Sequence, residues 1–130
     1  MLTFKKTERL CRKKLISELY TKGNQLFYYP FKVLWLVSDL ITCEKNAQIL
    51  ICVSKKNVSS AFKRNKIKRQ IKEAYRRNKY NYFEYLKNSS KQNLLVFHYL
   101  EKKIISYQEI EAKIILILHR LQLENEKTNR

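Results

Sequence analysis

The sequence predicts an α+β fold, a two-layer α–β sandwich with the element order α-β-β-α-β-α. Segments with apolar residues at helical spacing alternate with short β-branched and aromatic runs, and no repeat or low-complexity linker divides them. The length of 130 residues suits one hydrophobic core. We therefore expect a single domain over residues 1–130, with its core at about 7–123 and a frayed tail at 124–130. Helices should cover one face of the sheet, leaving the other partly open.

The N-terminal half should form one helix and two strands. Apolar residues at helical spacing indicate a helix from about Thr7 to Lys22, and Gly23 supplies a C-terminal stop. Leu26 to Val37 is aromatic and β-branched, which predicts one long strand, with Pro30 placing it at a sheet edge or a bulge. Ala47 to Ser54 predicts a second strand, antiparallel to the first.

The C-terminal half should begin with a basic helix, which residues Tyr80 to Tyr85 could continue before a turn at residues 88–90. Asn93 to Leu100 predicts a third strand. Ser106 and Glu109 have the Ser-x-x-Glu spacing of a capping box, which predicts the start of a final amphipathic helix.

The basic helix is the most informative segment. Residues 55–79 hold eleven Lys and Arg but only one acid, Glu73. Ile67, Ile71 and Ala74 recur at helical spacing and form a narrow stripe that can pack against a core. The opposite face should carry Asn65, Lys66, Lys68, Arg69, Lys72, Arg76, Arg77 and Lys79. A docked helix with cations on its outer face is suited to binding phosphates.

The overall charge also points to a polyanionic partner, because the formal net charge is +17. Four of the eight arginines fall between Arg64 and Arg77, and an arginine can bond phosphate oxygens in a bidentate way. A membrane surface is disfavoured, since the basic helix has only a thin apolar stripe.

The cysteines give little sign of a metal or disulfide site. Cys11, Cys43 and Cys52 show no C-x-x-C spacing, so we expect three buried, reduced thiols. No apolar run resembles a signal peptide or a membrane span, and the chain is expected to be cytoplasmic.

A stand-alone protein nuclease is disfavoured by the chemistry of the side chains. Metal-dependent nucleases gather several carboxylates on two cations, whereas Asp39 is the only aspartate. His98 lies in a predicted strand and His119 on the last helix, and each is more often structural than catalytic. Gly23, the sole glycine, excludes a glycine-rich phosphate loop. We expect no catalytic residue and no protein-bound metal.

Aromatic residues on the predicted strands suggest a second binding element. They are Phe27, Tyr28, Tyr29, Phe31, Trp35 and Phe97. Those on the open face, beside Ile16 and Tyr20 of the first helix, could form a trough that stacks single-stranded bases. Packing in the core is the alternative for each of them, and the sequence leaves both open.

Two segments together carry a family resemblance. Residues 53–56 read Val-Ser-Lys-Lys, and residues 61–76 read Ala-Phe-Lys-Arg-Asn-Lys-Ile-Lys-Arg-Gln-Ile-Lys-Glu-Ala-Tyr-Arg. This pattern resembles the strand-end V-S-K-K and R-N-R helix of the bacterial ribonuclease P protein subunit. The aromatic before Lys-Gly at residues 20–23 and the Ser-Tyr-x-Glu opening of the last helix agree as well. The resemblance covers about residues 10–121.

The resemblance implies a binding role beside a catalytic RNA. In that family, Mg²⁺ held by the RNA activates water to remove the 5′ leader of precursor tRNA. The protein binds the catalytic RNA and holds the leader in a cleft between the first helix and the sheet. A left-handed β-α-β crossover at the basic helix is also implied, against the usual right-handed rule.

The site residues follow from the motif positions. Expected contacts to RNA are Lys55, Lys56, Lys63, Arg64, Asn65, Lys66, Lys68, Arg69, Lys72 and Arg76. Expected residues of the leader cleft are Ile16, Tyr20, Phe31 and Trp35. Lys66 and Lys72 replace arginines of the pattern and lose the bidentate fork, while Ile16 replaces an aromatic.

The expected partners are ribonuclease P RNA and precursor tRNA, with no membrane and no protein partner. The alternative is a ribosomal or other structural RNA-binding protein with a similar helix and no part in cleavage.

Overall fold

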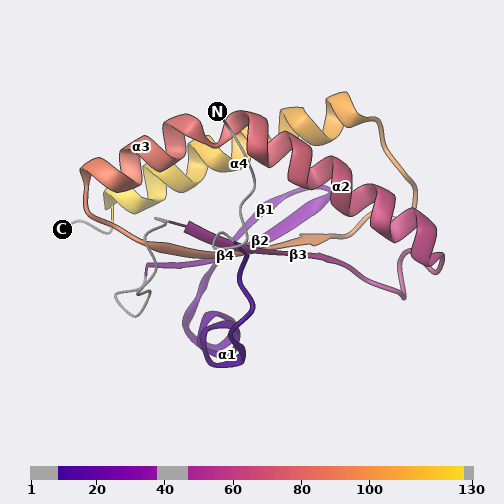
Figure 1. Cartoon of the computed structure of the whole chain (residues 1–130), viewed down its shortest axis with the longest axis horizontal. Coiled ribbons are helices and arrows are strands. Elements are labelled where there is room, and N and C mark those ends of the chain that lie inside the picture. Colours follow the sequence, from indigo (N-terminus) through magenta and orange to yellow (C-terminus); the bar gives the residue numbers. More distant parts are fainter. Residues whose placement is uncertain (1–8, 38–46, 128–130) are drawn as a thin grey trace.

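The computed structural model describes residues 9–37 and 47–127, which form four strands and four helices (Figure 1). In chain order they are α1 (Lys13–Lys22), β1 (Asn24–Tyr28), β2 (Phe31–Val37), β3 (Ala47–Val53), α2 (Ala61–Asn78), α3 (Tyr80–Asn88), β4 (Asn93–Tyr99) and α4 (Tyr107–Lys127). This arrangement confirms the α+β prediction. The order is more divided than expected, because one predicted strand is two and the basic helix is followed by a separate α3.

The four strands form one sheet in the order β1-β2-β4-β3. β2 pairs antiparallel with both β1 and β4, and β3 pairs parallel with β4. The expected pairing of β3 with the preceding strand is therefore wrong, since β4 lies between them. Neighbouring parallel strands need a crossover connection, and α2 and α3 supply it. Its left-handed sense stays a prediction.

The predicted long strand at residues 26–37 is a hairpin. Tyr29 and Pro30 form its turn, and Tyr28 pairs with Phe31 on the other side. Proline has no N–H to donate to a strand ladder and favours turns, which explains the break. The turn also reverses which residues face the core, so that Leu26 lies opposite Val33 and Phe27 lies opposite Lys32.

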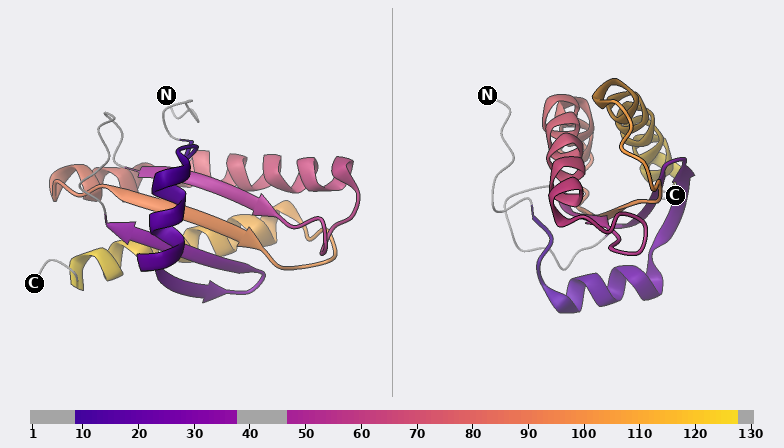
Figure 2. Two further views of the ribbon diagram at one scale, coloured as in Figure 1. Left: turned by 90° about the horizontal axis from the view of Figure 1, so that it is seen from below. Right: turned by 90° about the vertical axis from the view of Figure 1, so that its right-hand side faces the viewer.

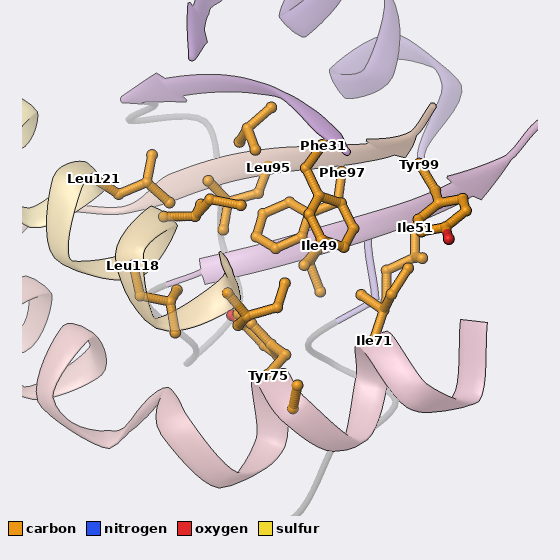
Figure 3. Packing of buried hydrophobic residues seen from close by; sticks show 14 of the residues in the cluster. Phe31, Ile49, Ile51, Ile71, Tyr75, Leu95, Phe97, Tyr99, Leu118 and Leu121 are labelled. Carbon is orange, nitrogen blue, oxygen red and sulfur yellow. The ribbon is translucent and has the colours of Figure 1, made fainter. Parts of the chain in front are cut away.

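Three helices, α2, α3 and α4, cover one face of the sheet (Figure 1). The main core lies between them and the strands. Phe97 is at its centre, with ring centroids 6.3 Å from Phe31 and 6.2 Å from Tyr75, and all three side chains are fully buried (Figure 3). Ile71 of α2 and Leu118 of α4 close the same cluster. The predicted apolar stripe of α2 is confirmed, and Tyr75 extends it.

Among the described residues, α1 is the one helix on the opposite face of the sheet, where it crosses the strands (Figure 2). Leu15 and Leu19 of α1 pack on Leu34, Leu94 and Val96, forming a second, smaller apolar cluster. One ten-residue helix is too short to cover four strands, so within residues 9–37 and 47–127 part of this face stays accessible, as expected.

The two ends of α1 are held close to the sheet. The helix begins at Lys13, not at Thr7, and Leu10 donates its N–H to the Ile49 carbonyl of β3 at 2.9 Å. At the other end, a Cβ atom on Gly23 would lie 2.3 Å from the Leu19 carbonyl oxygen and 3.2 Å from the Trp35 carbonyl oxygen. Only glycine allows this close approach of α1 to β2.

The last helix extends further than expected. α4 is capped by Ser106, which accepts the Glu109 N–H at 3.2 Å, and it continues to Lys127, where a frayed tail was expected. Asn125 explains the extension, because its buried amide exchanges hydrogen bonds of 2.8 and 2.9 Å with the Asn93 side chain of β4. The Tyr82 hydroxyl donates to Asn93 at 2.6 Å, which joins α3 to this buried network.

Candidate nucleic-acid interface

The outward face of α2 and the loop before it form a basic surface. Six of the ten predicted RNA-binding residues are exposed, namely Lys55, Lys56, Lys63, Asn65, Lys66 and Arg69. Four are half-buried, namely Arg64, Lys68, Lys72 and Arg76. The first turn of α2 holds no acid, so the partial positive charge of the helix N-terminus adds to that of the side chains. We call these ten residues the basic face.

Lys79 does not belong to this face, contrary to the sequence prediction. Its side chain is buried, and its ammonium lies 5.1 Å from the ring centroid of Phe83. Lys79 is the residue at which α2 ends and α3 begins, so it lies beyond the last turn of the basic helix.

Arg64 fixes the loop from which α2 starts. Its Nη1 donates to the carbonyl oxygens of Val58 at 2.9 Å and Ser59 at 2.8 Å. Ser60 caps the helix by accepting the Lys63 N–H at 3.3 Å. This arginine therefore orders the first turn of the basic face, in addition to any contact with a ligand.

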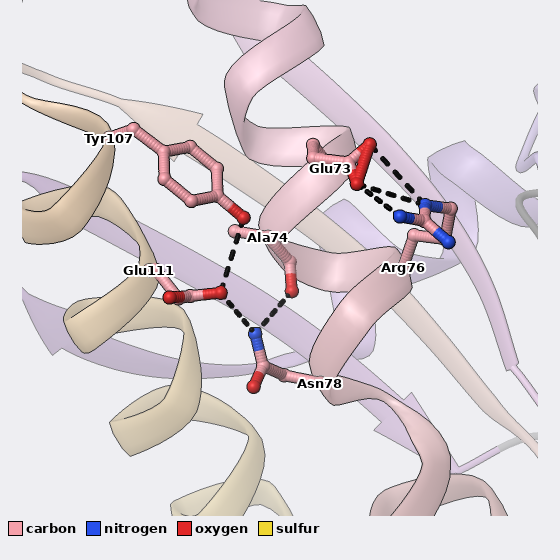
Figure 4. Close-up of polar contacts among 6 residues, drawn as sticks. All are labelled: Glu73, Ala74, Arg76, Asn78, Tyr107 and Glu111. Atoms are coloured by element: carbon pink, nitrogen blue, oxygen red, sulfur yellow. Dashed lines mark hydrogen bonds and ion pairs between the residues drawn. The ribbon is translucent and has the colours of Figure 1, made fainter. Parts of the chain in front are cut away.

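Arg76 is engaged by the one acid of the basic segment. Its Nε donates to the two Glu73 carboxylate oxygens at 3.2 and 3.3 Å, and Nη2 forms an ion pair with the same group (Figure 4). The pair holds the pKa of Glu73 below its ordinary value and raises the pKa of Arg76. Arg76 consequently presents less free positive charge than Arg69.

The C-terminal end of α2 is tied to α4. Asn78 donates to the Ala74 carbonyl at 2.8 Å and to the Glu111 carboxylate at 3.1 Å, and the Tyr107 hydroxyl donates to the same carboxylate at 3.2 Å (Figure 4). With Arg64 ordering the first turn, both ends of the basic helix are fixed in the fold.

A hollow of about 190 Å³ lies beside β3. Lys68 and Lys72 of α2 and Arg9 of the N-terminal segment line it, together with apolar residues that include Leu50 and Ile51. Three cations around an apolar floor suit a nucleotide, whose phosphate is anionic and whose base is planar and apolar on its faces.

Two of the four predicted leader-cleft residues are on the wrong side of the sheet. Phe31 is fully buried and Trp35 is 2% exposed, and both belong to the core under α2 and α4. Of the other two, Ile16 is half-buried against the α1 cluster, and Tyr20 is 51% exposed one helical turn later. Phe31 and Trp35 are thus corrected to core residues.

The residues that do lie beside Tyr20 form a row across the sheet. The pairing Phe27–Lys32–His98–Cys52 links β1, β2, β4 and β3 on the face that carries α1. We call this row together with Tyr20 the open face. Phe27 is 63% exposed, while Lys32, His98 and Cys52 are half-buried.

Tyr20 and His98 contact each other at the centre of the open face. The Tyr20 hydroxyl and His98 Nε2 are 2.7 Å apart, and the rings meet edge to face with centroids 5.9 Å apart. Burial, and then the charge of Lys32, lower the pKa of His98, so the imidazole is neutral at pH 7 and shares a hydrogen bond with the Tyr20 hydroxyl. Together they offer an aromatic and polar surface beside a cation.

Cys52 belongs to the open face, and its thiol is close enough to Lys68 of the basic face to feel the charge of that ammonium. Burial raises the pKa of its thiol, while the Lys68 ammonium of α2 acts in the opposite direction. The thiol is therefore neutral at pH 7 and behaves as a small apolar group. Cys11, expected to be buried, is exposed, and Cys43 lies outside the described residues.

Nothing in the described ranges resembles a metal-dependent catalytic centre. Residues 9–37 and 47–127 contain no group of three His, Cys, Asp or Glu side chains that could hold a metal. Within the same ranges, no helix combines the length and the apolar character that crossing a bilayer requires.

Comparison with known proteins identifies the family. The family model described as Ribonuclease P matches residues 4–122. The chain belongs to the ribonuclease P protein family. A ribonuclease P protein component from Chlorobium phaeobacteroides is 29% identical over 136 residues, and the match covers 93% of this chain and 89% of that protein.

Solved structures of ribonuclease P proteins share the fold. The Thermotoga maritima protein superimposes with a TM-score of 0.64 at 25% identity, covering 87% of this chain and 96% of that one. The Staphylococcus aureus protein gives a TM-score of 0.67 at 23% identity, with 88% and 94% covered.

Sequence reasoning missed Lys32 and His98 as residues of the open face, and it named Phe27 as a candidate for the aromatic trough but not for the leader cleft. A signal for them was present, because Pro30 marks a turn. Placing a two-residue hairpin loop at residues 29–30 pairs Tyr28 with Phe31, and therefore Phe27 with Lys32. The strand alternation would then have put both of them opposite the core.

Proposed function

We propose that this chain is the protein subunit of a ribonuclease P, a complex in which RNA carries out the cleavage. In this proposal the basic face binds the catalytic RNA, and the open face holds the single-stranded 5′ leader of precursor tRNA. The chain would act in the cytoplasm and would raise the affinity of the RNA enzyme for its substrate.

The basic face is the observation that carries the proposal. α2 is docked by four buried residues and ordered at its first turn by Arg64, so its cations are held in a fixed array. A fixed array can match the spacing of phosphates on a folded RNA, whereas a basic tail gives only sequence-independent attraction. Membership of the ribonuclease P protein family makes ribonuclease P RNA the expected partner.

The open face supports the leader role because it suits an unpaired strand. Tyr20 and Phe27 are exposed aromatics on which bases can stack, and Lys32 supplies a cation for the backbone. The hollow lined by Arg9, Lys68 and Lys72 also includes Leu50 of β3, which like Cys52 of the open face packs against the α1 cluster. A strand on the open face could therefore pass directly onto the basic face.

The Mg²⁺ ions of the reaction would be held by the RNA. Hard cations prefer several carboxylate oxygens, and the one acid of the basic segment is paired with Arg76. The protein's own residues would bind and position RNA and would not activate water.

A reconstitution tests the proposal. Labelled precursor tRNA is incubated with the protein alone, with ribonuclease P RNA alone, and with both, at an Mg²⁺ concentration too low for the RNA alone. We expect cleavage at the mature 5′ end only when both are present. Cleavage by the protein alone would make it a nuclease, and no gain over the RNA alone would favour a structural RNA-binding protein.

Arg69→Ala should weaken binding of ribonuclease P RNA and reduce the slope of log K against log salt by about one, since one phosphate contact is lost. Arg69 is preferred to Arg64 because it is exposed and Arg64 also orders the loop. The matched control is Arg120→Ala, an exposed arginine on α4 that is paired with Glu124 at 3.2 Å. If the slope of log K against log salt were equal in Arg69→Ala and the control, Arg69 would not contact a phosphate of the RNA.

A further inference from the structure

Phe62 is a large apolar side chain in an unexpected place. It is 73% exposed, more than any other large hydrophobic residue that the structure describes, and it belongs to the first turn of α2. A single exposed apolar residue is common on protein surfaces. This one, however, lies beside the cations of the basic face, where an exposed phenyl ring adds nothing to the binding of phosphates.

Helical spacing places Phe62 in line with the polar residues of the basic face. Asn65 and Lys66 follow at three and four positions, and Arg69 follows at seven, so the four side chains share one stripe of α2. All four are exposed. A ligand that follows this stripe from Arg69 past Lys66 to the start of the helix therefore reaches the phenyl ring.

The turn that carries Phe62 is ordered. Ser60 caps it, and Arg64 bonds the carbonyl oxygens of the two residues before the cap. Within the described residues, Phe62 has no aromatic ring packed against it. The backbone is thus held in place while the ring remains available, which reduces the entropy lost when a partner covers it.

We propose that Phe62 stacks on an unpaired base of the catalytic RNA, while the phosphates beside that base are bound by Lys66 and Arg69. This inference rests on the proposed function. A nucleotide matches both halves of the site, because its base has a π-face and its backbone is anionic. A second copy of the chain fits poorly, since two basic faces would repel each other.

The test measures binding of ribonuclease P RNA to the wild type and to Phe62→Ala, Phe62→Leu and Phe62→Trp. We expect Kd to rise about tenfold in the Ala and Leu variants and to stay within about twofold of the wild type in the Trp variant. The salt slope should not change, because Phe62 carries no charge. The Phe62→Leu variant separates stacking from simple apolar contact, because leucine is apolar but has no ring. The matched control is Tyr80→Ala, which removes an aromatic side chain of α3 that is 57% exposed.

Phe62→Trp also provides a direct readout. Trp35, the only native tryptophan, is buried, so a new indole at position 62 should dominate any change in emission. We expect quenching when ribonuclease P RNA is added, as stacking on a base requires, and no quenching with precursor tRNA alone. Quenching by precursor tRNA alone would assign the contact to the substrate and overturn the proposal.

The other outcomes are equally decisive. Wild-type affinity in both Phe62→Ala and Phe62→Leu, with the wild type binding and stimulating the RNA, would reject the stacking contact and leave the proposed function intact. Sedimentation showing a dimer that Phe62→Ala dissociates would assign Phe62 to self-association instead. A wild-type protein that neither binds nor stimulates the RNA would reject both proposals together.

Discussion

The two faces of the sheet use the same strands and the same kinds of residue for opposite purposes. On the face under α2 and α4, Phe31 and Phe97 are fully buried and packed ring against ring. On the face that carries α1, Phe27 and Tyr20 are more than half exposed, beside Lys32 and His98.

The difference between the faces lies in what covers them. Three helices bury most of one face, and its buried aromatics contribute to stability through the hydrophobic effect. One short helix covers part of the other face, and its aromatics gain little from folding. An aromatic residue in this sheet therefore contributes to stability or is available for binding, according to the parity of its position.

Phe31→Ala provides the strongest way to break this comparison. Removal of a fully buried phenyl ring should lower the free energy of unfolding by about 3–5 kcal/mol, which urea titration measures. The control is Phe27→Ala on the open face, which should change the free energy of unfolding by less than about 0.5 kcal/mol. If Phe31→Ala left stability unchanged and weakened leader binding, the assignment of the faces would be reversed.

Tyr20→Ala should have the next largest effect, on binding of the leader. Loss of one stacked base is worth about 1–3 kcal/mol, so the complex with ribonuclease P RNA should bind precursor tRNA roughly 5- to 150-fold more weakly. Affinity for mature tRNA, which has no leader, should not change. Equal losses for both RNAs would show that Tyr20 supports the fold and does not contact the leader.

His98→Gln should have the smallest effect and should change how stability depends on pH. In the wild type, burial and Lys32 lower the pKa of His98, so the unfolded chain binds the proton more readily than the folded one. This contribution to stability is complete above the ordinary histidine pKa of about 6.5 and is lost as pH falls below it. The glutamine variant lacks this loss, although its amide can still accept from Tyr20.

Urea titrations at about pH 7.5 and about pH 5.5 check this prediction, because few other groups titrate between these values. The stability of the wild type relative to His98→Gln should decrease on acidification. A constant difference between the two proteins would mean that His98 titrates as it does in the unfolded chain.

Much of the fold could be predicted because it depends on local patterns. The stripe of Ile67, Ile71 and Ala74 indicated which side of α2 is buried, and Ser106 marked the start of α4. The pairing of β3 could not be predicted in the same way, since strand order depends on contacts between distant segments. The length of α4 was not predicted, because it depends on the buried hydrogen bond between Asn125 and Asn93. A sequence pattern gives no sign of such a bond, and polar residues near a chain end are expected to be exposed.

The candidate site was predicted to a different extent in each of its parts. The cations of α2 followed from charge and helical period, and only Lys79 was misplaced, because it lies at the change from α2 to α3. The open face was only half predicted. The family resemblance implied Phe31 and Trp35 for the cleft, whereas the turn at residues 29–30 places Phe27 on the face of α1 and Phe31 in the core.

A substitution at Gly23 should affect the open face and leave the basic face unchanged. Because a Cβ at this position would collide with the Leu19 carbonyl, any other residue must displace the last turn of α1, which carries Tyr20. The basic face lies on the other side of the sheet and would keep its geometry (Figure 2). A substitution at the only glycine would thus separate the two activities proposed here, leaving a protein that assembles with its RNA but no longer retains the leader.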